Sequence, residues 1–184
     1  MNDGEFSIED FLTQLDKYPQ FKTGRWVNSE ESKILCDRVK TCEIYFESGT
    51  ANGFSALNVA LETSCIVHTF DPVNRPKIWE SVNISKDVIE KICFHQDKFE
   101  MASPLIQSNT ELHKSFFIDG DHGQGFVLRD FATIEPFLKS KDVIVFHDLR
   151  NNSVMKAWDQ IRQSREFYSE EKIRTTRKMG ILVV

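Results

Sequence analysis

Apolar positions along this chain follow two periods, one typical of strands and one typical of helices. Short, nearly continuous apolar runs recur at intervals, and the segments between them place apolar residues at helical spacing. Ser169–Lys172 is charged and is expected to be a solvated turn before the last strands. The runs that predict strands are 43–47, 65–70, 91–95, one around Phe116, one around Val143, 172–177 and 180–184.

Helical segments fill most of the intervals between these runs. Asn28 and Glu31 have the spacing of a capping box, so a helix is expected from there to about Val39. Ser103-Pro104 suits an N-cap followed by proline at the first helical position, and Pro136 is expected to bend a helix near its end. The expected helices are 6–15, 28–39, 54–61, a weak one within 79–89, one after Ser103, 124–138 and 152–165.

The alternation of strands and helices predicts the fold class. It favours an α/β fold with a doubly wound, mostly parallel sheet. The last two strands have no long helix between them, which predicts an antiparallel C-terminal edge. There is no internal repeat and no linker-like segment, so we expect one domain, 1–184, with an N-terminal helical segment (1–39) and a core (40–184).

Composition narrows the class of protein. The 184 residues are 40% hydrophobic and carry a formal net charge of -5, so no global basic field favours nucleic acid or an anionic membrane. The four cysteines form no CxxC pair, which argues against a cysteine zinc site and is consistent with reduced thiols in the cytoplasm. The N-terminus lacks the pattern of a signal peptide, and no apolar stretch approaches membrane-spanning length.

Two of the apolar runs end in acidic and imidazole side chains. The run SFFI leads into Asp119-Gly120-Asp121-His122, and DVIVF leads into His147-Asp148. The carboxyl ends of parallel strands are where ligands bind in open α/β sheets, so these groups are candidates for catalysis or metal binding. Structural readings stay open as well: Asp121 could cap the following helix, and His147 could be a buried histidine bonded to a backbone carbonyl.

A glycine-containing turn follows the first strand of the core. In Glu47–Ser55 two glycines, Gly49 and Gly53, permit tight turning and close approach of a ligand to the backbone. The turn is neither GxGxxG nor a P-loop. Asp71 and Asp97 follow the next two strands, as acids that bind ribose or adenine do in nucleotide-binding sheets.

The segment ESGTANGFSALNVA resembles motif I of class I S-adenosylmethionine-dependent methyltransferases, in the variant of small metal-dependent O-methyltransferases of the catechol and antibiotic-sugar type. HTFDP and FIDGDH…VIVFHDL are similar to later motifs of that group. The resemblance implies S-adenosylmethionine as cofactor, with Asp71 holding the ribose and Asp97 the adenine. The residues it places around the cofactor are Glu47, Gly49, Thr50, Gly53, Phe54, Ser55, Asp71, Asp97 and Asp119, although Phe54 fits a purely structural core position equally well.

The same resemblance implies a metal and a base. The acids at the positions of Asp119 and Asp148 commonly ligate the metal in the related enzymes, and the base follows the first acid, which here means Asp121 or His122. Oxygen ligands suit Mg²⁺, and His147 as a further ligand would extend the choice to Mn²⁺, Fe²⁺ or Zn²⁺.

This sequence departs from the family pattern directly after Asp148. Leu149 stands where relatives usually have Asn or a second Asp. A third protein ligand would then come from His147, Asn151, Asn152 or water, which leaves metal dependence open.

The resulting interpretation is methyl transfer to a hydroxyl oxygen of a small molecule or sugar. A homodimer is compatible with this interpretation. The acceptor is expected to contact Gly24-Arg25-Trp26 and 150–153. Two alternatives remain: a non-catalytic methyltransferase-like binding or assembly protein, and a metal-dependent hydrolase or hydroxylase that uses the acid–histidine cluster.

Overall fold

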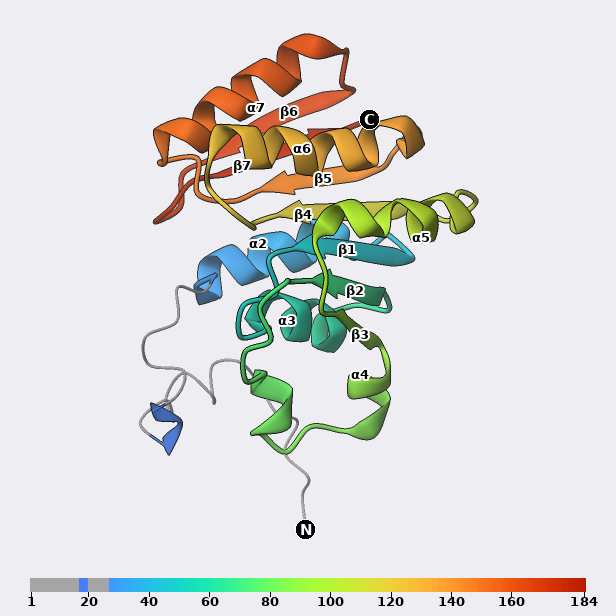
Figure 1. Ribbon diagram of the computed structural model, residues 1–184, viewed down its shortest axis with the longest axis vertical. Coiled ribbons are helices and arrows are strands. Elements are labelled where there is room, and N and C mark those ends of the chain that lie inside the picture. Colours follow the sequence, from blue (N-terminus) through green and yellow to red (C-terminus); the bar gives the residue numbers. More distant parts are fainter. Residues whose placement is uncertain (1–16, 20–26) are drawn as a thin grey trace.

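A seven-stranded sheet forms the centre of the molecule (Figure 1). The computed structural model describes residues 17–19 and 27–184. The strand order is β3-β2-β1-β4-β5-β7-β6; β7 pairs antiparallel with β5 and with β6, and the pairs from β3 to β5 are parallel. The strands are β1 (Ile44–Ser48), β2 (Ile66–Phe70), β3 (Ile92–His95), β4 (Lys114–Ile118), β5 (Val143–Phe146), β6 (Ser169–Ile173) and β7 (Met179–Val183). The expected mostly parallel sheet with an antiparallel C-terminal edge is confirmed.

Helices cover both faces of the sheet (Figure 1). On one face lie α2 (Ser29–Val39) and α3 (Phe54–Glu62), and on the other α5 (Ser103–Ser108), α6 (Gln124–Ile134) and α7 (Asn152–Ser164). A short helix, α4 (Lys86–Glu90), precedes β3, and single 3-10 turns occur at η3 (Ile78–Glu80), η4 (Phe99–Ala102) and η5 (Glu135–Phe137). The expected capping box opens α2, with Glu31 N donating to Asn28 Oδ1 at 2.9 Å.

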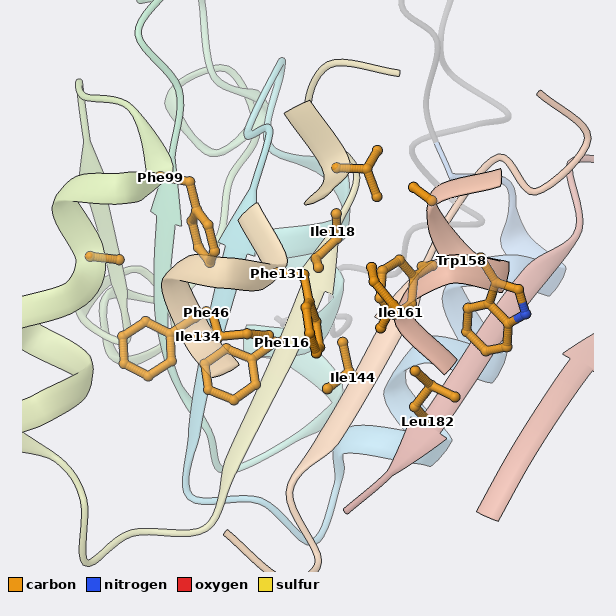
Figure 2. Close-up of a cluster of buried hydrophobic side chains, with 14 of the residues drawn as sticks. Phe46, Phe99, Phe116, Ile118, Phe131, Ile134, Ile144, Trp158, Ile161 and Leu182 are labelled. Carbon is orange, nitrogen blue, oxygen red and sulfur yellow. The ribbon is translucent and has the colours of Figure 1, made fainter. Parts of the chain in front are cut away.

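The sheet has a hydrophobic core on each of its faces, because apolar residues occupy successive positions of its strands. Because adjacent residues of a strand point to opposite faces, Phe46 and Phe116 pack toward α5, α6 and α7, whereas Tyr45 and Phe117 pack toward α2 and α3. Figure 2 shows the larger cluster, in which Trp158 and the side chains of α6 meet the sheet. Burial of each large apolar side chain stabilises the fold by about 2 kcal/mol.

Three local predictions need correction. Ser169–Lys172 is not a turn but most of edge strand β6, whose Glu170, Glu171 and Lys172 are exposed. Charged side chains on an edge strand prevent pairing with another sheet, which is why the segment resembled a solvated turn. Helix α6 ends at Ile134 because the following turn, which contains Pro136, is 3-10. The N-cap of α5 is Ala102, one residue before the expected Ser103.

Two segments for which the sequence makes predictions lie outside the described residues. They are the expected helix at 6–15 and the expected acceptor segment Gly24–Trp26. Among the helices of the described ranges, none has the length and apolar character needed to cross a bilayer.

The order of the strands fixes where a ligand can bind. The chain builds outward from β1 to β2 and β3, then returns to the other side of β1 with β4. The loops after β1 and β4 therefore diverge to opposite faces and leave a crevice at the carboxyl ends of these strands. The glycine turn and the first acidic cluster meet at this crevice.

Candidate active site

A cavity of about 390 Å³ lies at the carboxyl ends of β1, β2 and β4. We call it the switch-point cavity, since it sits where the strand order reverses. Side chains from α6 and from the η4 segment close its far wall. The lining residues include Ser48, Gly49, Ala51, Phe70, Asp71, Lys98, Phe99, Asp119, Asp121, Phe126, Arg129 and Asp130.

Gly49 brings the ends of β1 and β4 into contact. Its φ is +92°, and a Cβ there would lie 2.5 Å from the carbonyl oxygen of Asp119. Asp119 N donates to Ser48 O at 3.1 Å across the same gap. Any side chain at Gly49 would force the two strand ends apart, so glycine is required for the backbone geometry of the cavity.

Asp71 supports the glycine turn from the end of β2. Its Oδ2 accepts a hydrogen bond from Ala51 N at 2.9 Å, and its Oδ1 accepts one from Val73 N at 2.8 Å. The carboxylate lines the switch-point cavity. Asp97 differs: it follows β3, its Oδ1 accepts from Lys98 N at 2.8 Å, and it is exposed and absent from the lining. The structure therefore brings Lys98 and Phe99, rather than Asp97, to this part of the cavity.

Glu47 lies behind the turn rather than in the cavity. The side chain is fully buried, Oε1 accepts a hydrogen bond from Ser55 Oγ, and Oε2 has no partner among the described residues. Burial raises the pKa of the carboxyl to about 8. Glu47 therefore holds the start of α3 in place and is neutral at neutral pH.

The other residues of the turn divide between two environments. Thr50, Phe54 and Ser55 line a small cavity of about 20 Å³ that adjoins the turn, and the Thr50 hydroxyl lies 2.6 Å from that of Thr69. Gly53 has φ +83°, and a Cβ there would lie 2.1 Å from the Trp79 ring. Gly53 thus serves the packing of the turn.

Asp119, His122 and Asp148 form a cluster at the ends of β4 and β5. One potential ligand atom from each lies within 4.8 Å of the others. His122 Nε2 is 3.0 Å from Asp148 Oδ2 and 3.7 Å from Asp119 Oδ1. The two carboxylates raise the pKa of His122 to about 9. Asp121 lines the switch-point cavity beside this cluster, and its Oδ1 accepts from Gly123 N at 2.8 Å, which anchors the start of α6.

His147 lies below this cluster with both ring nitrogens against carboxylates. Nδ1 is 2.9 Å from Asp119 Oδ1, and Nε2 is 3.2 Å from Glu31 Oε2. Burial alone would lower the pKa of this imidazole, but Asp119, Asp148 and Glu31 raise it to about 11. A metal could reach a His147 nitrogen only by displacing a carboxylate, so the set of neighbouring ligand atoms contains His122 instead of the expected His147.

Sequence reasoning missed two acids of the site. The sequence indicates only a capping role for Glu31. In the structure its side chain is fully buried and also accepts a hydrogen bond from Arg177 N at 2.9 Å. Asp130 reads as an ordinary helix position, yet it lines the switch-point cavity and accepts a hydrogen bond from Ser48 Oγ. Burial raises the pKa of Asp130 to about 6. The one signal in the sequence would have been an acidic residue on the apolar face of a predicted amphipathic helix.

A second cavity of about 260 Å³ opens on the other side of the acid–histidine cluster. We call it the loop cavity; it is lined by His122, Asp148, Asn151 and Arg177. Asp148 has φ +57°, and Leu149 N donates to Lys178 O at 3.0 Å, where Lys178 has φ +60°. Left-handed backbone at two non-glycine residues is strained, and such strain concentrates at functional sites.

Known proteins share sequence features and the fold with this chain. A family model described as "Methyltransferase domain" matches residues 46–149, which include the glycine turn and both acidic strand ends. A search of curated protein sequences gives no match.

Solved structures share the fold at low sequence identity. The O-methyltransferase from Bacillus cereus, in complex with SAH, is 14% identical with a TM-score of 0.65, covering 96% of this chain and 90% of that one. The O-methyltransferase TomG from Streptomyces achromogenes, in complex with SAM, is 13% identical with a TM-score of 0.72, covering 98% and 91%. A methyltransferase from Geobacter sulfurreducens is 12% identical with a TM-score of 0.72, covering 95% and 87%.

Proposed function

Because this chain belongs to the methyltransferase-domain family, we propose that it binds S-adenosylmethionine and transfers the methyl group to a hydroxyl oxygen of a small molecule or sugar. The observation that carries the proposal is the position of the switch-point cavity. One wall is the glycine turn with Asp71, and the opposite wall is Asp119 with Asp121. A cofactor held by the first wall would lie directly beside the groups that can handle an acceptor hydroxyl.

The lining of this cavity fits the cofactor. The Asp71 carboxylate is held at the carboxyl end of β2 by two backbone N–H groups, a position suited to accepting hydrogen bonds from ribose hydroxyls. Phe70 and Phe99 meet edge to face, with ring centroids 5.7 Å apart, and supply an apolar surface for the adenine. Asp119 and the backbone at Gly49 would border the methionine part. S-adenosylmethionine supplies an electrophilic methyl group, so positioning provides much of the acceleration.

The acceptor hydroxyl must also lose a proton, and this chain offers two groups for that step. His122 lies between Asp119 and Asp148, which favour its protonated form, so it must release its proton before it can act as a base. Asp121 is exposed and borders the switch-point cavity. We assign the base to Asp121 or His122.

The donor set of the cluster fits a divalent metal. Asp119 and Asp148 offer carboxylate oxygens and His122 offers an imidazole nitrogen, a combination that suits Mn²⁺ and also admits Mg²⁺. With His122 as a ligand, the base is Asp121. When bound, such an ion lowers the pKa of a coordinated hydroxyl. An Asp119→Ala variant with full activity would remove the metal from the proposal.

Calorimetry with S-adenosylhomocysteine tests the central claim. The wild-type protein should bind it, and Asp71→Ala should weaken binding by about tenfold or more, since hydrogen bonds to a carboxylate are lost. Asp87→Ala, an exposed acid on α4, is the matched control and should bind like wild type. Absence of binding to the wild-type protein would overturn the proposal. Binding without methyl transfer to any hydroxylated acceptor would instead favour the non-catalytic alternative.

A further inference from the structure

Four cations lie on the two loops that adjoin the loop cavity, and one of them, Arg177, lines it. Arg150 follows β5, and Arg174, Arg177 and Lys178 belong to the turn between β6 and β7. Arg150 N donates to Arg177 O at 3.1 Å, which holds the two loops together. Arg150 and Arg174 are exposed, and Arg177 lines the cavity itself. In Figure 1 both loops lie on the side of the sheet where α6 and α7 begin.

These cations are poorly neutralised by the protein. Within residues 17–19 and 27–184, no carboxylate lies within ion-pair distance of Arg150, Arg174 or Lys178, and Arg177 reaches only Asp148, at 3.7 Å. Two cations elsewhere on the same hairpin and helix are paired: Arg162 contacts Asp159 at 3.1 Å, and Lys172 contacts Asp159 at 3.3 Å. The positive charge is therefore local, in a chain whose net charge is -5.

The acids of the active site cannot supply the missing negative charge. Asp148 already has His122 at 3.0 Å and His147 at 3.5 Å, and Glu31 is buried against His147 and the backbone of Arg177. The N-terminus of α7, a helix of 13 residues, also opens beside this cavity, with Asn151 as its cap. Its backbone dipole adds to the positive potential there.

We propose that the methyl acceptor carries an anionic group, a carboxylate or a phosphate, next to the hydroxyl that is methylated. The anion binds Arg177 at the loop cavity, with Arg150 and Arg174 closing over it, while the hydroxyl reaches the Asp119–His122–Asp148 cluster. Arginine suits this role because its planar guanidinium binds both anions through paired hydrogen bonds. This inference rests on the proposed function, since it requires that the cluster receive the acceptor.

Matched pairs of probes test the inference. Protein saturated with S-adenosylhomocysteine is titrated in a calorimeter with 3,4-dihydroxybenzoate and catechol, and separately with glucose 6-phosphate and glucose. At least one anionic probe should bind about tenfold more tightly than its neutral partner, and its affinity should fall as salt is added. The first pair reports a carboxylate acceptor and the second a phosphate acceptor.

Substitutions then locate the binding. Each charge removed from solvent-exposed surroundings should weaken the anionic probe about threefold, so Arg150→Gln/Arg174→Gln should weaken it about tenfold. Lys86→Gln removes one positive charge from α4, at the edge of the sheet opposite β6 and β7, and should leave the affinity for the anionic probe unchanged. Both proteins should unfold at the wild-type temperature, because the substituted side chains are exposed.

The outcomes separate this inference from the function on which it rests. If the protein binds S-adenosylhomocysteine but neither anionic probe binds better than its neutral partner, the inference is overturned and the proposed function stands. Equal loss of affinity in Lys86→Gln and the double variant would also overturn it. If S-adenosylhomocysteine itself does not bind, the proposed function fails and the inference fails with it.

Discussion

Replacing Glu47 with glutamine should remove a loss of stability that the wild-type protein suffers as the pH rises. The carboxyl is fully buried, and its pKa in the folded protein is about 8, against an ordinary value of 4.5. Between about pH 4.5 and about pH 8, the folded state therefore keeps a proton that the unfolded state has already released. Stability from this group is full below the unfolded pKa and is lost as the pH rises through the folded pKa. Between about pH 5 and about pH 9 the loss amounts to about 4 kcal/mol.

Glutamine keeps the shape of the side chain and does not titrate. The Glu47→Gln protein should therefore gain about 4 kcal/mol relative to wild type between these two pH values, measured by urea denaturation at each pH. The acid–histidine cluster is present in both proteins, so its own titration largely cancels in the difference. Glu62→Gln, an exposed acid on α3, is the matched control. A Glu47→Gln difference that stays constant within about 1 kcal/mol would refute burial as the state of this carboxyl.

Three further predictions concern the backbone, the buried histidine and the sheet. Gly49→Ala should destabilise the protein by about 2 kcal/mol or more in thermal denaturation and abolish binding of S-adenosylhomocysteine, because the Cβ meets Asp119; wild-type stability would contradict the geometry. Glu31→Gln should lower the pKa of His147 below about 11 in an NMR titration, whereas an unchanged value would exclude Glu31 as its partner. Lys114→Met should cost about 3 to 5 kcal/mol in urea denaturation, since it leaves a buried carboxylate unpaired; a neutral effect would count against that ion pair.

The arrangement of charge around His147 ties together segments that lie far apart in the sequence. A buried imidazolium between Glu31 and Asp119 ties α2 to the ends of β4 and β5. Asp119 is thereby held in place as a lining residue of the switch-point cavity and a member of the acid–histidine cluster. His147 is thus a positioning residue for Asp119, whereas the His122 side chain beside it is 32% exposed.

The sequence by itself determined most of the described elements and the edge of the sheet at which the site lies. Strand-length apolar runs that end in Asp71, Asp119 and Asp148 indicate carboxylates at one edge, because parallel strands point the same way. The capping box of α2 and the glycine turn were equally readable, since both depend on side chains a few residues apart. These features are local, and the structure has them where the sequence placed them.

Only the tertiary structure decided which of these groups meet. Glu31 and His147 are 116 positions apart, and no periodic pattern relates them. Asp97 follows a strand like the other acids, but β3 lies at the end of the sheet, two strands from β1, and its loop leaves the carboxylate outside the cavity. The physical reason is that contacts between distant segments depend on strand order, register and the path of each loop, whereas hydrophobic periodicity encodes only which face of an element is buried.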